Sequence, residues 1–211
     1  MLPRLSLFLL AFCPPLFAAE KPNILFLLAD DMRPDCIAAL GNPKIETPNL
    51  DKLVGRGMTF TRATCSYPIC VVSRAEILTG MHGWENGVKG FRGNAFVEGV
   101  TFWGDAMQAA GYESWYVGKW HTSGRPTARG FNDVAGLFSG GGGKFWKEGQ
   151  RDWKNFPITG YRGWIFQSAD GKEKYPEMGV GVTPDISEKF ADAAITLLER
   201  KPDKPWFCCV N

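Results

Sequence analysis

The stretch Asn23-Ile24-Leu25-Phe26-Leu27-Leu28-Ala29 is an unbroken apolar run with the length of a β-strand. It lacks alternating polar residues, a pattern typical of a strand that is covered on both faces in the middle of an α/β sheet. We therefore expect a central, mostly parallel β-sheet flanked by helices. The run ends at Asp30 and Asp31, where α/β sheets place their ligand sites.

Asp30 and Asp31 place two like charges next to each other. Such a pair is costly unless a cation or hydrogen-bond donors neutralise it. Hard cations such as Ca²⁺ prefer several carboxylate oxygens, so the pair is a candidate metal site, with Mg²⁺ as a second choice. The competing interpretation is a pair of solvated turn residues, because aspartate is common in turns.

Further helices and strands are predicted along the chain. Thr47-Pro48 and Thr183-Pro184 each combine an N-cap threonine with proline at the first helical position. Helices are therefore predicted after both pairs, the second running to about residue 200, and another over 101–111. Strands are predicted over 58–62, 112–118 and 205–210.

The segment from Cys70 to Gly80 brings a candidate nucleophile close to Arg74 and to a predicted helix start. Ser73 and Glu76 have the spacing of a capping box, which predicts that the helix begins near Ser73. A helix start offers unpaired N–H groups and a partial positive charge, which would stabilise an anion at Cys70. The alternative is a buried structural cysteine beside an ordinary helix cap.

Lys119 and His121 follow the predicted strand 112–118. In extended backbone both project to the same side, which would place an ammonium and an imidazole together at a strand end. Taken alone, such a pair more often belongs to an exposed edge. His82, the other histidine, lies in a glycine-bounded loop and is interpreted as a surface residue. The absence of Cys-x-x-Cys and of paired histidines argues against zinc.

Residues 136–181 form a long stretch without a periodic pattern that is rich in aromatic residues. These are Phe145, Trp146, Trp153, Phe156, Tyr161, Trp164 and Phe166. The stretch is too aromatic for a disordered linker. It is interpreted either as a lid or wall that packs on a sugar or aryl group, or as a small satellite core.

Composition and the N-terminus limit the partners. The net charge of +2 indicates neither a nucleic-acid partner nor an anionic membrane surface. Residues 1–19 combine Arg4, a short apolar core and two terminal alanines, as in a signal peptide. The apolar core is too short for a transmembrane span, so we do not expect an integral membrane protein. We expect export to the periplasm or the extracellular space.

Five cysteines remain when residues 1–19 are set aside. Cys208 and Cys209 lie in an apolar run and are predicted to be core residues. An odd number leaves at least one cysteine unpaired in an oxidising compartment. A Cys65–Cys70 disulfide is an open alternative that would exclude Cys70 as a nucleophile.

Together these segments resemble the N-terminal part of a sulfatase of the alkaline-phosphatase superfamily. The resemblance is carried, in the family's order, by residues 22–31, 47–51, 70–80, 101–121 and 205–207. It implies an alkaline-phosphatase-like α/β fold, incomplete at the C-terminus, in which residues 20–211 are a truncated catalytic domain. It also implies hydrolysis of a sulfate ester of a small molecule or glycan.

The resemblance assigns a modification to Cys70. In the family, the corresponding cysteine is converted by a maturation enzyme to formylglycine (3-oxoalanine), whose hydrate attacks the sulfur of the ester. The resemblance also implies that Asp30, Asp31 and the residue-70 oxygen bind a divalent cation, usually Ca²⁺. The family's modification motif is Cys-x-Pro-x-Arg, and Val72 stands at the proline position of this chain.

By the same resemblance, Arg74 and Lys119 steady the hydrate and the developing charge, and His121 transfers a proton. Two other functions remain open. A phosphoester or phosphonate hydrolase could use the same scaffold, although its nucleophile would ordinarily be serine or threonine. A catalytically degenerate binder of sulfated ligands would keep Cys70 unmodified.

Overall fold

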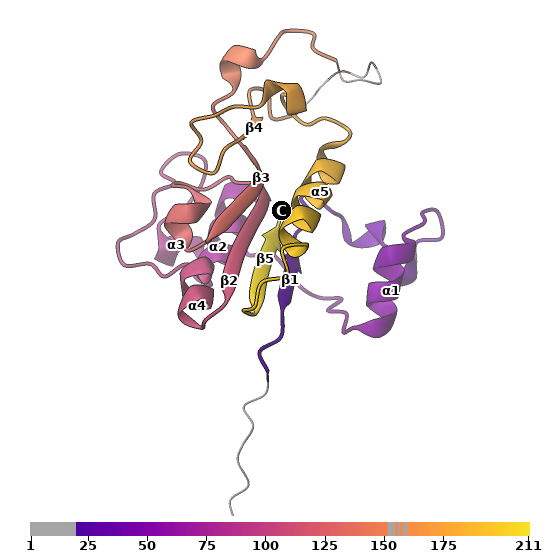
Figure 1. Ribbon diagram of the computed structural model, residues 1–211. Helices are drawn as coiled ribbons and strands as arrows, with labels where there is room; N and C mark the ends of the chain where they lie inside the picture. Colours follow the sequence, from indigo (N-terminus) through magenta and orange to yellow (C-terminus); the bar gives the residue numbers. More distant parts are fainter. Residues whose placement is uncertain (1–19, 152–154, 156, 158–159) are drawn as a thin grey trace, which may run out of the picture.

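The computed structural model describes residues 20–211, except 152–154, 156 and 158–159. Within these residues a five-stranded sheet has the order β1-β5-β2-β3-β4. The strands are β1 (Ile24–Leu27), β2 (Glu113–Lys119), β3 (Asp133–Ser139), β4 (Ile165–Gln167) and β5 (Trp206–Val210). The first four in sheet order run parallel, and β4 pairs antiparallel with β3. The predicted mostly parallel α/β sheet is confirmed (Figure 1). The predicted signal peptide lies outside the described residues.

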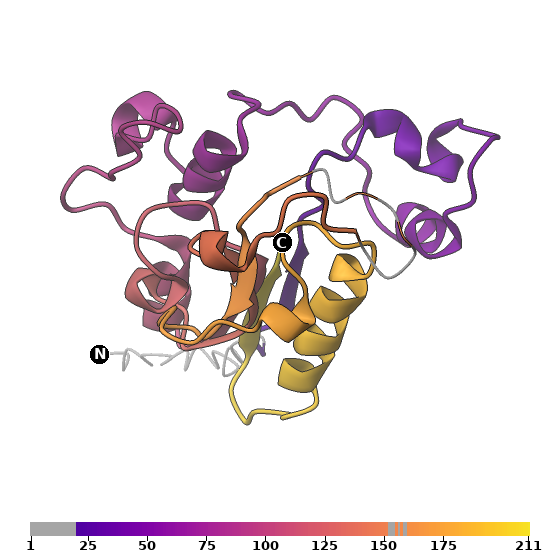
Figure 2. The ribbon, with the colours of Figure 1, turned by 90° about the horizontal axis from the view of Figure 1, so that it is seen from above.

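Helices lie on both faces of the sheet (Figure 2). The α-helices are α1 (Pro48–Arg56), α2 (Cys70–Thr79), α3 (Gly83–Asn86), α4 (Trp103–Ala109) and α5 (Ile186–Leu198). Short 3₁₀ turns span Pro34–Cys36, Ala38–Leu40, Pro126–Arg129, Gly143–Phe145 and Pro176–Met178. Helices α2 and α4 lie on one face and α5 on the other, whereas α1 stands beyond the β1 edge in both ribbon views.

The face beneath α2 and α4 holds the larger aromatic core. Phe102 at the start of α4, Tyr116 of β2 and Phe207 of β5 are buried there with Trp120 and Phe131. Their rings meet edge-on or tilted; Tyr116 and Trp120, for example, have centroids 5.0 Å apart at 86°. This packing stabilises the two central strands from one side.

The opposite face is only partly covered. Helix α5 packs against β3, β2 and β5, and its Leu197 is buried with Trp115 and Cys208. The expectation that β1 is covered on both faces is wrong, because Leu25 is 45% and Leu27 60% exposed. Within the described residues β1 is the edge strand, and α5 lies over its neighbours rather than over β1 itself.

Most predicted elements are present, with shifted ends. Helices α1 and α5 follow Thr47-Pro48 and Thr183-Pro184 as expected, and α4 begins at Trp103 rather than at Thr101. The prediction of a strand over 58–62 is wrong, because these residues form no strand in the structure. Its apolar residues are exposed and have no neighbouring strand to pair with, which a strand requires for its backbone hydrogen bonds.

Candidate active site

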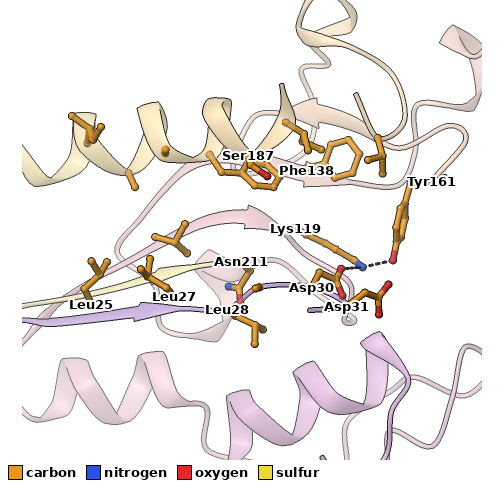
Figure 3. Close-up of a pocket in the computed structure, with 18 of the residues that line it drawn as sticks. Leu25, Leu27, Leu28, Asp30, Asp31, Lys119, Phe138, Tyr161, Ser187 and Asn211 are labelled. Atoms are coloured by element: carbon orange, nitrogen blue, oxygen red, sulfur yellow. Dashed lines mark hydrogen bonds and ion pairs between the residues drawn. The ribbon is translucent and has the colours of Figure 1, made fainter. Parts of the chain in front are cut away.

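The carboxyl edge of the sheet gathers most of the predicted site residues. Asp30 and Asp31 follow β1, and Lys119 is the last residue of β2, two strands away across β5. Lys119 Nζ forms an ion pair with Asp30 Oδ2 (Figure 3). Asp31 adopts a left-handed backbone with φ 57° and lines the same pocket. Parallel pairing has therefore brought residues 89 positions apart into contact.

Gly118 allows Lys119 to turn toward this edge. The pairing of β2 with β3 changes register between Val117 and Lys119, and Gly118 has φ +96°. A Cβ atom at Gly118 would collide with the carbonyl oxygen of Asn211. The same carbonyl accepts the backbone N–H of Lys119 at 2.9 Å. A residue without a side chain is thus required for this close approach.

Arg74 is buried beside Lys119 and Asp30. Its Nη1 donates to the carbonyl oxygen of Lys119 at 3.0 Å, and its Nη2 lies 3.5 Å from Asp30 Oδ2. That Nη2 has no hydrogen-bond partner among the described residues, so a buried donor remains for an anionic oxygen. Partial burial opposes ionisation of Asp30, but the Lys119 and Arg74 cations outweigh it and hold its pKa below the ordinary value.

Cys70 lies at the start of α2, as the sequence predicted, but the cap differs. The N-cap is Ile69, so Ser73 lies inside the first turns and the prediction that the helix begins near Ser73 is wrong. The Glu76 carboxylate accepts hydrogen bonds from the Ser66 hydroxyl and the Gly83 N–H instead. These longer-range partners replace the capping box, and Cys70 becomes the first helical residue.

His121 faces the Cys70 thiol, with its Nδ1 3.1 Å from Cys70 Sγ. Burial, together with the positive charges of Lys119 and Arg74, lowers the pKa of His121 to about 4. The imidazole is therefore neutral at pH 7. A neutral ring nitrogen beside residue 70 can accept a proton.

The aromatic stretch contributes side chains to this site that the sequence did not single out. The hydroxyl of Tyr161 contacts Lys119 Nζ and lies 3.9 Å from Cys70 Sγ. Trp164 stands edge-on to His121, with ring centroids 4.6 Å apart. Phe166, in contrast, is buried against Phe138 and α5 as part of a satellite core.

Phe166 thus agrees with the interpretation as a satellite core, whereas packing of the stretch on a sugar or aryl group stays a prediction. Burial and the neighbouring Cys70 and Asp30 raise the pKa of Tyr161, so its hydroxyl stays protonated at neutral pH. The predicted contributions of Trp153 and Phe156 lie outside the described residues. The only sequence signal for Tyr161 was its membership of an aromatic-rich segment.

Three further expectations concern Cys65, the pair Cys208 and Cys209, and His82. Cys65 and Cys70 are both free thiols, so the alternative of a disulfide between them is not realised in this structure. Cys208 and Cys209 are buried in the sheet, as predicted. His82 is exposed and stacks on Trp84, in agreement with a surface position.

The described residues do not by themselves complete a calcium site. No group of three or more His, Cys, Asp or Glu side chains among them is arranged to hold a metal. Two neighbouring carboxylates offer fewer oxygens than the six to eight that Ca²⁺ prefers, and Asp30 is already paired with two cations.

The sequence was also compared with models of known protein families. The family model described as Sulfatase matches residues 22–210. This chain belongs to the sulfatase family. The match includes all six predicted site residues, and the sulfatase resemblance inferred from the sequence is confirmed.

Curated sulfatases are similar to part of the chain. An arylsulfatase of Clostridium perfringens is 36% identical over 114 residues, which cover 54% of this chain and 24% of that protein. An N-acetylgalactosamine-6-sulfatase of Sus scrofa is 37% identical over 121 residues, which cover 52% of this chain and 23% of that protein. The chain thus spans about a quarter of the length of these relatives.

Solved structures agree with the fold over most of the chain. One, of a protein in complex with its substrate D-glucosamine-2-N,6-O-disulfate, has a TM-score of 0.66 and 26% identity. It aligns with 90% of this chain and 34% of that structure. A structure of Ps i-CgsB in complex with k-i-k-neocarrahexaose has the same TM-score, 25% identity, and coverages of 90% and 44%. The alkaline-phosphatase-like class is therefore confirmed.

Proposed function

We propose that the complete protein hydrolyses sulfate esters at residue 70. One observation carries the proposal: the Cys70 thiol at the start of α2 lies 3.1 Å from His121 Nδ1, and the Tyr161 hydroxyl contacts the Lys119 ammonium and lies 3.9 Å from the same thiol. A nucleophile precursor and a base are thus in contact, and two cations are near enough to influence the pKa of the base. Membership of the sulfatase family supports the same chemistry.

The two cations are suited to an anionic group. Arg74 and Lys119 are both buried, and Asp30 is the carboxylate paired with them among the described residues. Arg74 also has a donor with no partner in this part of the chain. Pre-placed cations in a dry site stabilise charge that develops on sulfo oxygens without first having to reorganise. We assign this role to Lys119 and Arg74.

Cys70 is proposed as the site of formylglycine formation by a maturation enzyme. When formed, the hydrated aldehyde supplies an oxygen nucleophile for the sulfur of the ester. The half-buried thiol faces His121 Nδ1, which can take up a proton from a group on residue 70. Val72, at the proline position of the modification motif, is itself buried.

A divalent cation and export complete the proposal. Asp30 and Asp31 are proposed as two of the ligands of Ca²⁺, or of Mg²⁺, with the other ligands drawn from elsewhere in the complete protein.

Residues 1–19 are proposed to direct export to the periplasm or the extracellular space. Among the residues that the structure describes, no helix is long and apolar enough to cross a membrane.

A sulfated small molecule or glycan is the proposed substrate class. The named relatives include an arylsulfatase and an N-acetylgalactosamine-6-sulfatase. Phe91 is exposed, and the centroid of its ring lies 5.7 Å from that of His121. An aromatic surface is therefore available beside the site for a sugar or aryl ring.

The test compares Cys70→Ala with Cys65→Ala in the complete protein, produced together with its maturation enzyme. Cys65 is a free, exposed thiol five residues away and serves as the matched control. We expect p-nitrophenyl sulfate turnover in the wild type and in Cys65→Ala, and none in Cys70→Ala. Chelation of divalent cations should lower turnover, and added Ca²⁺ should restore it.

Mass spectrometry of the tryptic peptide 63–74 reports the state of residue 70. An aldehyde in the active protein supports the proposal. Ordinary sulfatase activity in Cys70→Ala would contradict it, as would faster turnover of p-nitrophenyl phosphate than of the sulfate. Binding of a sulfated ligand without turnover, by a protein with an intact thiol, would favour a degenerate binder instead.

A further inference from the structure

Tyr161 contacts the proposed machinery without belonging to any of the predicted motifs. Its hydroxyl contacts Lys119 Nζ on the side away from Asp30, so that the ammonium lies between the carboxylate and the phenol (Figure 3). The same ammonium lies 4.1 Å from the centroid of the Tyr161 ring. The hydroxyl is also 3.9 Å from Cys70 Sγ. One side chain therefore connects Lys119 to residue 70.

The backbone at Tyr161 is held in an unusual conformation. Its φ of 50° lies in the left-handed region, which bulky residues seldom adopt unless the surroundings impose it. Trp164 supplies such surroundings, because its N–H donates to the Tyr161 carbonyl at 2.8 Å and its ring packs edge-on at 4.9 Å. Trp164 also contacts His121, so the two rings beside Cys70 share one support.

The chemistry of the contact explains why a phenol is suited to this place. The Lys119 ammonium is buried and needs acceptors for its N–H groups. Asp30 supplies one acceptor but also cancels charge. A protonated phenol supplies a second acceptor and orients the ammonium while leaving its positive charge available to an anion.

We propose that Tyr161 is a positioning residue that acts through Lys119, holding its ammonium toward residue 70 for the oxygens of a sulfo group. This inference rests on the proposed function. It predicts that the hydroxyl matters more than the ring, because the ring also packs on Trp164 and would keep that contact in Tyr161→Phe.

The first test needs no turnover. The chain carrying Tyr161→Phe is treated with an amine-acetylating reagent, and acetylation of Lys119 is followed by mass spectrometry relative to the exposed Lys172. Loss of one hydrogen bond should raise the relative rate at Lys119 by roughly 3–10-fold. Tyr175→Phe is the matched control, because its hydroxyl contacts Glu173 in the same segment. An unchanged Lys119 rate in Tyr161→Phe overturns the inference.

The second test uses the complete, matured protein. Tyr161→Phe should lower kcat for p-nitrophenyl sulfate about tenfold and change KM less than about threefold, because orientation in the transition state is lost. In a Lys119→Arg background the same substitution should cost less than about twofold. An equal loss in both backgrounds overturns positioning through Lys119. A wild type without turnover contradicts the proposed function, whereas the acetylation rates still decide the role of Tyr161.

Discussion

The two faces of the sheet differ in how completely helices cover them. Strand β1 shows this difference, because its side chains on one face are packed and those on the other are exposed. Ile24 and Phe26 point into the aromatic core beneath α2 and α4. Leu25 and Leu27 point to the α5 side, where they stay exposed and line a cavity of about 680 Å³ that reaches Asp30 and Lys119 (Figure 3). Alternate residues of one apolar run thus have opposite environments.

The covered face, which packs beneath α2 and α4, holds the backbone of Lys119 in place. Tyr116 from the covered face donates its hydroxyl to the Lys119 carbonyl at 2.5 Å, and Arg74 of α2 donates to the same oxygen. The open face contributes the apolar wall of the cavity, including Phe190 and Ile195 of α5. We therefore expect substitutions on the covered face to have larger effects on folding.

The largest expected effect is that of Phe207→Ala in β5. Phe207 is fully buried against Trp103 and Phe131, so truncation should cost about 3–5 kcal/mol of the free energy of unfolding. Leu25→Ala, on the open side of the neighbouring strand, should cost about 1 kcal/mol or less. Urea denaturation followed by circular dichroism measures both. Equal losses would contradict the difference between the faces.

A smaller loss of stability is expected for Gly118→Ala, near the carboxyl end of β2. The new Cβ would collide with the Asn211 carbonyl, and φ +96° is unfavourable for alanine, so we expect a loss of about 2–3 kcal/mol. Gly55→Ala is the matched control. Gly55 lies within α1 with open space around its Cα, so alanine should be neutral or stabilise by about 0.5–1 kcal/mol. A tolerated alanine at Gly118 would show that the register shift does not need glycine.

The smallest expected effect concerns the first turn of α5, the helix that packs on the open face. Hydrogen bonds from Lys189 and Thr183 hold the pKa of Asp185 below its ordinary value. A lowered folded-state pKa stabilises the fold above the unfolded value of about 4, and this stabilisation is lost as the pH falls through the folded-state pKa.

Asp185→Asn should therefore cost about 0.3–0.5 kcal/mol at pH 7, as expected for a partly exposed ion pair at i,i+4. The difference from the wild type should shrink as the pH falls below about 4. Thermal unfolding of both proteins across this pH range provides the measurement. A difference that grows at low pH would have the wrong sign.

Local patterns predicted the parts of the molecule that depend on local chemistry. The apolar run before Asp30, the proline-capped helices and the Lys119–His121 pair all lie where parallel strands or helix starts place them. The contact of His121 with Cys70 joins residues 51 positions apart and could be expected only from the family resemblance. The catalytic and metal-binding roles of these residues remain predictions.

The errors arose where distant residues decide the outcome. The helix at Cys70 begins before Ser73, and Glu76 bonds with Ser66 and Gly83 rather than within its own turn. The pattern over 58–62 had the alternation of a strand but no partner. Tyr161 reaches Lys119 only through packing on Trp164, and such packing has no sequence period by which it could be recognised.

The hydroxyl of Tyr116 limits which substitutions the surrounding core can accept. Because the same ring fills the aromatic core and fixes the carbonyl of Lys119, repacking around it would shift the ammonium before the chain lost its fold. Substitutions near Tyr116 should therefore affect both the stability of the fold and the position of Lys119. Those around Leu25 are under neither constraint to the same degree, and variation among natural variants should accumulate there first.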